Sequence, residues 1–310
     1  MKTPSPALYG VVAALLGGVA LAVQSRLNGE LGRQLGDGVA AALISFGGGL
    51  VVLLTATFAT RTGRASAARF RDAVRGRRLK AWQCVGGVLG AFFVLSQGLA
   101  AAALGVALFT VAGVAGQVVS GLLVDRAGFG PGDPRPVTTP RAVGALLTVA
   151  AVGVAVADRL GAPGHLWLIL LPLLAGAGLG VQQGLNGHVG KHSGGVLFAT
   201  TLNFGVGTVA LVVAEVVVVA VRGLPNPPPS DWRLYVGGLL GIVAISSTVY
   251  AVRVIGVLML GLSAVAGQLI GAVFLDLTSG QLATGTVIGV ALTLVAAAVA
   301  GVPRRPAPTG

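Results

Sequence analysis

The feature that most constrains this chain is the length of its uncharged runs. The longest, residues 81–124, holds 44 consecutive positions without a charged side chain. A soluble protein carries about a quarter charged residues, whereas here they make up 10% of the chain and the mean hydropathy is +0.90. Because a helix needs about 20 apolar residues to cross a bilayer core, we expect an all-α polytopic membrane protein.

Dividing the uncharged runs into bilayer lengths predicts ten transmembrane helices. The 44-residue run is too long for one helix, so we place a turn inside it, near Ala102 to Gly105. Glu215 interrupts another run without ending it. The expected spans are residues 7–25, 38–60, 81–102, 105–124, 141–158, 164–186, 195–221, 234–252, 255–275 and 282–302.

The distribution of Lys and Arg predicts that both termini face the cytoplasm. Cytoplasmic loops retain positive charge, and with the N-terminus inside, 16 of the 21 basic residues fall on that side and 5 on the other. Eight of the 16 lie between Arg61 and Lys80, which we interpret as a solvated loop, with binding to anionic lipid as the alternative. The net charge of +12 therefore reflects topology, and we expect no nucleic-acid partner.

Four segments of the first half recur in the same order in the second half. They are 23–29, 45–49, 86–90 and 115–117, which return as 181–187, 203–207, 237–241 and 266–268. The first two pairs are 158 positions apart and the other two are 151 apart. Each copy, 1–158 and 159–310, holds five expected helices, and an odd number forces the second copy to enter from the opposite face. Such a 5+5 inverted-topology repeat is typical of secondary transporters, whose substrate site lies near the midplane between the repeats.

The repeated motifs also resemble those of a known family. Gln-x-x-Leu-Asn-Gly at the end of the first span, Phe-Gly-x-Gly in the second, and Gly-Gln with a following Asp in the fourth are similar to the YdcZ-type inner-membrane exporters. These belong to the drug/metabolite transporter superfamily, and this chain resembles a fused two-repeat form. The resemblance covers nearly the whole chain. It implies a transporter in the bacterial inner (plasma) membrane that exports a small organic metabolite or drug by alternating access.

Seven amide side chains are the candidate substrate-binding residues: Gln117, Gln268, Gln24, Asn28, Gln182, Asn186 and Asn203. Counted from the turns near Gly105 and Gly256, Gln117 and Gln268 lie about 18 Å deep in a core of about 30 Å, so they are expected to approach each other near the midplane. An amide that faces lipid is costly, so each must face a cavity or another helix. Substrate contact and hydrogen bonding between helices both meet that condition.

The pairs Asn28-Gly29 and Asn186-Gly187 admit two interpretations. Asn-Gly terminates helices because both residues tolerate the left-handed conformation, so the pairs predict two helix ends. The alternative is that Gln24 with Asn28, and Gln182 with Asn186, form matched outer and inner gates around one central site.

Glu215 is the one carboxylate well inside an expected span, and an intramembrane ionisable group is a candidate for proton coupling. Its repeat counterpart is Thr57, and Arg222 follows about 10 Å further along the helix. The carboxylate could therefore snorkel to the outer surface, which is the structural alternative. Asp125 and Asp276 are expected to mark helix boundaries.

The remaining side chains favour a transporter over the other classes. His188 and His192 are four apart but have no carboxylate or thiol beside them, so no metal site is expected. No phosphate-binding loop of the Gly-x-x-x-x-Gly-Lys type occurs, and no cofactor is expected. A membrane-embedded enzyme acting on lipid-linked substrates should show clustered carboxylates, histidines or basic residues at one membrane face, and in this sequence none cluster outside the Arg-rich stretch 61–80. A non-transporting scaffold or assembly subunit is the other alternative. The expected partners are a small-molecule substrate and the lipid bilayer; a monomer is sufficient and a homodimer is left open.

Overall fold

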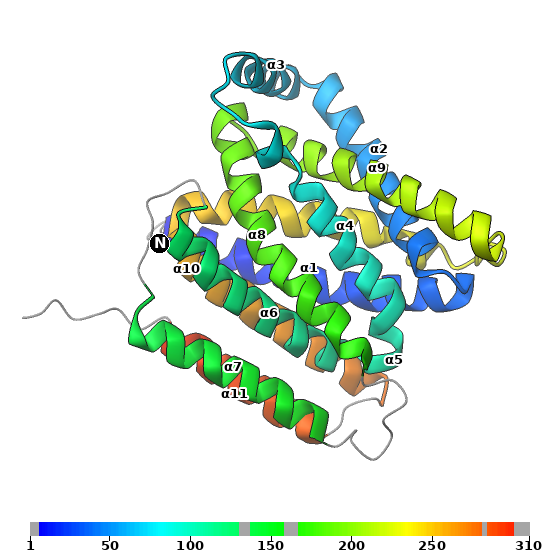
Figure 1. Cartoon of the computed structure of the whole chain (residues 1–310), viewed down its shortest axis with the longest axis vertical. Helices are drawn as coiled ribbons and strands as arrows, with labels where there is room; N and C mark the ends of the chain where they lie inside the picture. Colours follow the sequence, from blue (N-terminus) through cyan, green and yellow to red (C-terminus); the bar gives the residue numbers. More distant parts are fainter. Residues whose placement is uncertain (1–5, 130–136, 158–166, 281–283, 301–310) are drawn as a thin grey trace, which may run out of the picture.

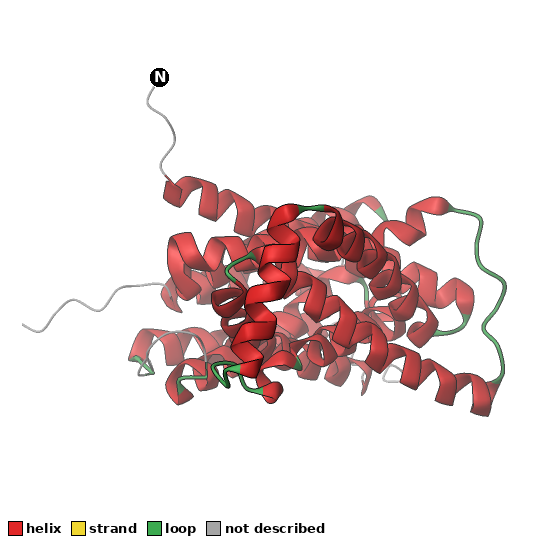
Figure 2. Cartoon of the chain, turned by 90° about the horizontal axis from the view of Figure 1, so that it is seen from above, coloured by secondary structure: helices red, strands yellow, loops and turns green. Residues whose placement is uncertain are grey.

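The computed structural model describes residues 6–129, 137–157, 167–280 and 284–300 (Figure 1). Within these ranges the chain is helical, and Figure 2 shows the helices joined by loops and turns without a strand. Apolar side chains dominate both the buried core and much of the exposed helix surface. An exposed apolar surface on long helices is what a lipid environment requires.

The helical segments follow one another in the order expected of two similar halves. In the first half they are α1 Pro6–Leu35, α2 Gly38–Ala59, α3 Arg61–Arg75, η1 Ala81–Cys84, α4 Gly86–Ser96, the π-helical turn η2 Gln97–Ala101, α5 Ala102–Leu104, α6 Val106–Ala127 and α7 Thr139–Ala157. In the second half they are α8 Leu170–Ser193, α9 Val196–Arg222, η4 Trp232–Val236, α10 Gly237–Thr278 and α11 Thr284–Ala300. Among the described residues, eight helical stretches are long and apolar enough to cross a membrane, and two shorter apolar helices accompany them.

In each half the chain reverses direction between the third and fourth spans without a long connection. In the first half, α5 ends at Leu104, Gly105 has a φ of 78°, and α6 starts at Val106. This break lies where the sequence places the turn within its longest uncharged run.

In the second half, the same reversal takes place inside α10. Its first part brings Ser247 against Gly17 of α1, and its second part brings Ala264 against the adjacent Gly18. The bend lies near Ile255, which contacts Gly10 close to the start of α1. Both parts of α10 therefore pack on α1 at the same level, and Figure 1 shows its yellow and orange parts running in different directions.

The two halves exchange their first helices. α1 packs along both parts of α10, and α8 packs against α4 and α6 (Figure 1). The other helices pair with their own counterparts, α2 with α9 and α7 with α11. Each first helix is thus held by the third and fourth spans of the other half, so the interface between the halves is also the core of the molecule.

Equivalent glycines allow the exchanged helices to come close. A Cβ on Gly18 would collide with the carbonyl oxygen of Ala264. A Cβ on Gly176, 158 positions later, would collide with the carbonyl oxygen of Gly113, which is 151 positions before Ala264. The repeat in the sequence is therefore also a repeat of contacts, made by small residues that let helix backbones approach.

The prediction that the Asn-Gly pairs end helices is wrong. Asn28 and Asn186 lie inside α1 and α8, which continue for seven more residues and stop before Gly36 and Gly194. These two glycines, with φ values of 65° and 67°, take the left-handed conformation that the asparagines were expected to take. The physical reason is that both asparagines are buried against other helices and bond to polar side chains there.

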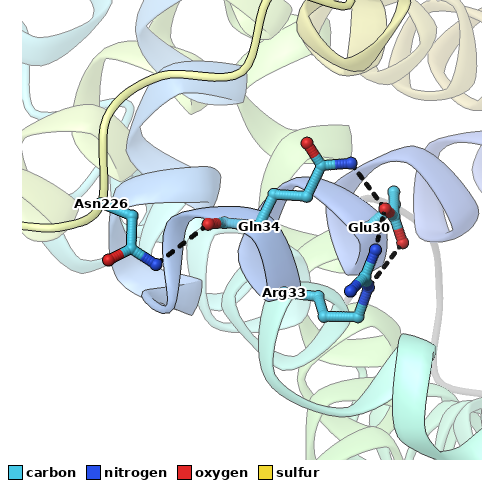
Figure 3. A network of polar contacts seen from close by, with 4 residues as sticks. All are labelled: Glu30, Arg33, Gln34 and Asn226. Atoms are coloured by element: carbon cyan, nitrogen blue, oxygen red, sulfur yellow. Dashed lines mark hydrogen bonds and ion pairs between the residues drawn. The ribbon is translucent and has the colours of Figure 1, made fainter.

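The C-terminal end of α1 is fastened by polar contacts to the loop that follows α9 (Figure 3). The backbone N–H of Asn226 donates to the carbonyl oxygen of Leu35 at 2.9 Å, and its side-chain amide donates to that of Gln34 at 3.1 Å. Glu30, one turn earlier, accepts from Arg33 and from the Gln34 amide. Carbonyls that the helix end leaves without partners are thereby satisfied.

The segment that we expected to be a solvated loop forms the helix α3 over residues 61–75, so the expectation of a loop is wrong there, while most of its residues are exposed. Arg69 Nε donates to the carbonyl oxygen of Ser193 at 2.9 Å, and the ring of Phe70 lies against that of Phe198 with centroids 4.8 Å apart. Ser193 is the repeat counterpart of Leu35, so the ends of α8 and α1 are fastened at equivalent carbonyls. α3 became ordered because it packs on α8 and α9.

Asp276 joins the two halves rather than simply marking a helix end. Its side chain is 2% exposed, and its carboxylate accepts from the backbone N–H of Val106 at 3.0 Å and of Ala107 at 2.7 Å. These are donors of the first turn of α6, which has no earlier carbonyls to bond. The side chain of Asp125, its counterpart, lies outside the described residues.

Candidate functional site, a cavity between the two halves

A cavity of about 210 Å³ lies between the halves. Its lining comes from α1, α2, α4, α6 and α7 of the first half and from α8, α9, α10 and α11 of the second. The walls are mostly apolar. Five of the seven predicted amides line it, namely Gln24, Gln117, Gln182, Asn186 and Gln268. Asn28 and Asn203 are buried beside it, outside the lining.

Gln117 of α6 and Gln268 of α10 line the cavity from the two halves, at equivalent positions. Both side chains are buried. The Nε2 of Gln268 has no hydrogen-bond partner within the part of the chain that the structure describes. A buried amide nitrogen without an acceptor is costly. The side chain of Gln268 is therefore a candidate to donate a hydrogen bond to a ligand in the cavity.

Gln24 and Gln182 occupy equivalent positions but differ in their hydrogen bonds. Gln24 Nε2 donates to the carbonyl oxygen of Gly237 at 3.0 Å. The corresponding carbonyl for Gln182 is that of Gly86, yet Gln182 Nε2 is buried with no partner among the described residues. The two halves therefore carry a glutamine at the same repeat position, but its hydrogen bonds differ between them.

A closed polar network fills the space between α1, α2 and η2. Asn28 Nδ2 donates to Gln97 Oε1 at 2.7 Å, and Gln97 Nε2 donates to Ser25 Oγ at 2.9 Å. Ser45 Oγ donates to Asn28 Oδ1 at 2.5 Å. All four side chains are at most 2% exposed. The network residues on α1, Ser25 and Asn28, lie beyond Gln24, the last residue of that helix in the cavity lining.

Gln97 is a functional candidate that the sequence reasoning missed. Its repeat counterpart, 151 positions later, is Thr248, so the search for repeated amides passed over it. The signal that could have found it is the one that identified Gln117, an amide inside a long apolar run that must find a polar partner.

The equivalent network in the second half is open. Asn203 Nδ2 still donates to Asn186 Oδ1 at 3.0 Å. Thr248 Oγ1 instead donates to the carbonyl oxygen of Ala244, in its own helix, at 3.0 Å. Gln183, Asn186 and Thr248 all line the cavity, whereas their counterparts Ser25, Asn28 and Gln97 do not. 

The cavity lining consequently lies closer to the C-terminal end of α8 than to that of α1. On α8 its lining runs from Leu179 to Gly187, but on α1 it runs only from Gly17 to Gln24. Arg141, in the first turn of α7, also lines it. The cavity therefore extends toward the end of the molecule where α8 stops and α7 begins.

Glu215 lies on α9 away from the cavity lining. Its Oε2 is buried and has no partner among the described residues. Thr57, its repeat counterpart, shares a hydrogen bond of 2.7 Å with Thr201 across the α2–α9 pair. The structure thus separates the candidate coupling carboxylate from the amides of the cavity.

Comparison with known proteins agrees with the two-repeat architecture. A family model described as "Putative inner membrane exporter, YdcZ" matches residues 9–154 and residues 167–299. No curated protein matches the chain. A solved structure titled "Crystal structure of protein" superposes with a TM-score of 0.58, covering 95% of this chain and 96% of its own, at 20% sequence identity. That likeness concerns the fold alone.

Proposed function

The chain belongs to the YdcZ family of inner-membrane exporters, as two fused copies, and on that premise we propose that it is a secondary transporter. Its cargo is a small organic molecule, and its mechanism is alternating access between two inverted repeats. The family and the long apolar helices support a multi-pass protein of the inner membrane.

The proposal includes ten transmembrane helices with both termini in the cytoplasm. In the part of the chain that the structure describes, eight helical stretches of membrane length and the shorter α7 and α11 would supply the ten. The excess of Lys and Arg in alternate connections supports the orientation, with 16 of the 21 on the cytoplasmic side. In this arrangement α8 ends, and α7 begins, at the cytoplasmic face.

The observation that carries the proposal is that equivalent residues at the two ends of the cavity have different surroundings. Gln183 and Ser25 are equivalent by sequence, yet Gln183 lines the cavity and Ser25 is buried in the closed network. In an inverted repeat, an exchange of conformation between the halves turns an inward-facing state into an outward-facing one. The present conformation corresponds to the state that loads cargo from the cytoplasm, as an exporter requires.

Outward opening then requires one polar network to break while the other closes. Asn28 and Ser25 would release Gln97, and Asn186 and Gln183 would close on Thr248. Each hydrogen bond contributes about 1 kcal/mol net. Hydrogen bonds are lost at one end of the cavity and gained at the other, so the inward-facing and outward-facing states differ little in free energy. A modest difference in the affinity of the cargo for the two states then suffices to shift the population.

For energy coupling we propose Glu215. It is an ionisable side chain within a membrane-length helix, and its buried Oε2 lacks a partner among the described residues. Protonation would remove the charge that makes this position costly in a membrane. Its distance from the cavity lining means that the coupling would act through the α2–α9 pair.

The test compares the two equivalent positions by cysteine labelling. The variants Ser25→Cys and Gln183→Cys are made in a Cys84→Ser background, so that each chain holds one thiol. A membrane-impermeant maleimide is applied to right-side-out and to inside-out membrane vesicles. Gln183→Cys should react from the cytoplasmic side, and Ser25→Cys should react slowly and only from the other side. Reaction of either thiol from both sides, or of neither from any side, would contradict alternating access.

A further inference from the structure

Two unmet hydrogen-bond donors belong to residues that line the transport cavity, and in this conformation neighbouring protein atoms cover both donor atoms. They are the Nε2 atoms of Gln182 on α8 and of Gln268 on α10, whose side chains are 4% and 5% exposed. Buried polar atoms in folded proteins are almost always hydrogen-bonded, so two such atoms in one cavity require an explanation. A ligand that brings acceptors would supply it.

The charged residues of the lining restrict the net charge of the ligand. Among the described residues that line the cavity there is no Asp or Glu, so a cationic ligand would be buried without a counter-charge. The charged residue in the lining is Arg141, in the first turn of α7, and it already takes part in an interaction of its own. The unmet donors belong to neutral amides, and burying a neutral carbonyl beside them costs less than burying a charged group. Both observations favour an uncharged ligand.

The size and walls of the cavity set the ligand's shape. Its volume of about 210 Å³ exceeds the 150 Å³ or so of an apolar cavity that accommodates benzene. Phe46, Phe93 and Phe204 contribute aromatic surface to the lining. A single ring, or an aliphatic group of similar size, with one short polar arm fits this space.

We propose that the cavity binds small, uncharged, mainly apolar molecules that carry a carbonyl-type acceptor, which Gln182 and Gln268 recognise. This assignment rests on the proposed transport function, because it identifies the chemical class of the cargo. The carbonyl accepts from one or both amides, while the apolar part of the molecule lies against the aromatic wall.

A competing explanation exists for Gln182 alone. Asn203 Oδ1 also lacks a partner among the described residues, and it lies 3.3 Å from the position of a Cβ on Gly90, with which Gln182 Nε2 would collide. The two atoms are therefore neighbours, and a small rotation would join them. Under that explanation, removal of the Gln182 amide would lower stability without changing ligand binding.

The experiment uses three probes of nearly equal shape: benzamide, benzoate and benzamidinium. Binding to the purified full-length protein is measured by thermal shift and by saturation-transfer NMR, since a ligand of the native state raises its apparent stability. Benzamide should bind saturably, benzoate at least tenfold more weakly, and benzamidinium not at all. Preferred binding of either charged probe, or no binding of benzamide to folded protein, would overturn the proposal.

The variants Gln182→Glu and Gln268→Glu keep the side-chain shape and replace the donor by an acceptor. Each should lose benzamide binding at least tenfold and gain binding of benzamidinium, a reversal that a purely structural role would not produce. Gln34→Glu, at the end of α1 and outside the cavity, is the matched control and should leave all three affinities unchanged. Unchanged benzamide binding in both cavity variants would sink the assignment.

The outcome separates this proposal from the proposed function. If the labelling of Gln183→Cys and Ser25→Cys shows alternating access but benzamide does not bind, only the ligand class is wrong. If benzamide binds through the glutamines while the labelling shows no alternation, the binding site stands and transport fails.

Discussion

Phe46 of α2 and Phe204 of α9 stack with ring centroids 4.8 Å apart and an interplanar angle of 30°. They are equivalent residues, 158 positions apart, so each ring packs on its own counterpart. Both line the cavity. The pair therefore marks where the approximate two-fold relation between the halves passes through the site.

Removing the two rings should lower the free energy of unfolding by less than the sum of the two single losses. Phe46→Ala and Phe204→Ala should each destabilise the protein by about 3–5 kcal/mol, and the double variant by about 0.5–1.5 kcal/mol less than their sum, because the ring-to-ring term is lost only once. Unfolding in detergent, followed for all four members of the cycle, measures this. Strict additivity would show that the rings do not interact.

The closed network predicts a shift in population when Gln97 is removed. In the Ser25→Cys protein, Gln97→Leu deletes the remaining bond to Asn28, which contributes about 1 kcal/mol, or roughly fivefold in an equilibrium constant. Ser25→Cys in this background should therefore label faster from the periplasmic side. Thr248→Val at the equivalent position is the control, since it leaves the closed network intact. Equal labelling rates with and without Gln97 would count against the network as a gate.

Two glycines on α8 predict opposite tolerance to a single methyl group. Gly176→Ala places a Cβ against the carbonyl oxygen of Gly113, whereas the nearest atom to a Cβ on Gly178 is a Leu89 methyl at 3.5 Å. The first variant should lose about 1–3 kcal/mol through overpacking, and Gly178→Ala should be neutral or slightly stabilising. Thermal unfolding of the two variants side by side decides the matter; similar melting temperatures would contradict the close approach.

Asp276 should be more important for stability than its place near a helix end suggests. Asp276→Ala leaves the N–H groups of Val106 and Ala107 without acceptors and should cost about 2 kcal/mol or more. Asp276→Asn keeps one acceptor and should cost less. The comparison is made on melting temperature, and equal losses in the two variants would argue against hydrogen bonding as the cause.

Glu215→Gln should abolish pH-driven transport while leaving expression intact, because the amide cannot release a proton. The measurement is flux into proteoliposomes with and without a pH gradient, using benzamide as the probe once its binding is established. Thr57→Ser, at the repeat counterpart, controls for disturbance of the α2–α9 pair. Unchanged flux in Glu215→Gln would exclude the coupling role.

The sequence predicted best what depends on repetition and on bilayer length. The pairing of Gln24 with Gln182 and of Gln117 with Gln268 came from the repeat, and all four side chains line one cavity. The helical character followed from the uncharged runs. These features are encoded by local composition and by self-similarity, both of which one sequence displays.

What the sequence could not predict depends on contacts between distant segments. The helices run on past Asn28 and Asn186 because buried partners from other helices satisfy those amides, and local propensity carries no information about such partners. The sequence repeat did not identify Gln97 because its counterpart, Thr248, is not an amide. Asp276 looked like a boundary residue because its partners, Val106 and Ala107, are about 170 positions away.

The exchange of α1 and α8 makes each half a partner of the other, since each first helix packs mainly on the third and fourth spans of the other half. Covalent fusion holds the two at a fixed one-to-one ratio and at a high effective concentration. It also frees equivalent positions to diverge. In a symmetric pair of identical chains every substitution would be made at both faces of the membrane, but here Gln97 and Thr248, or Glu215 and Thr57, can give the two faces different chemistry.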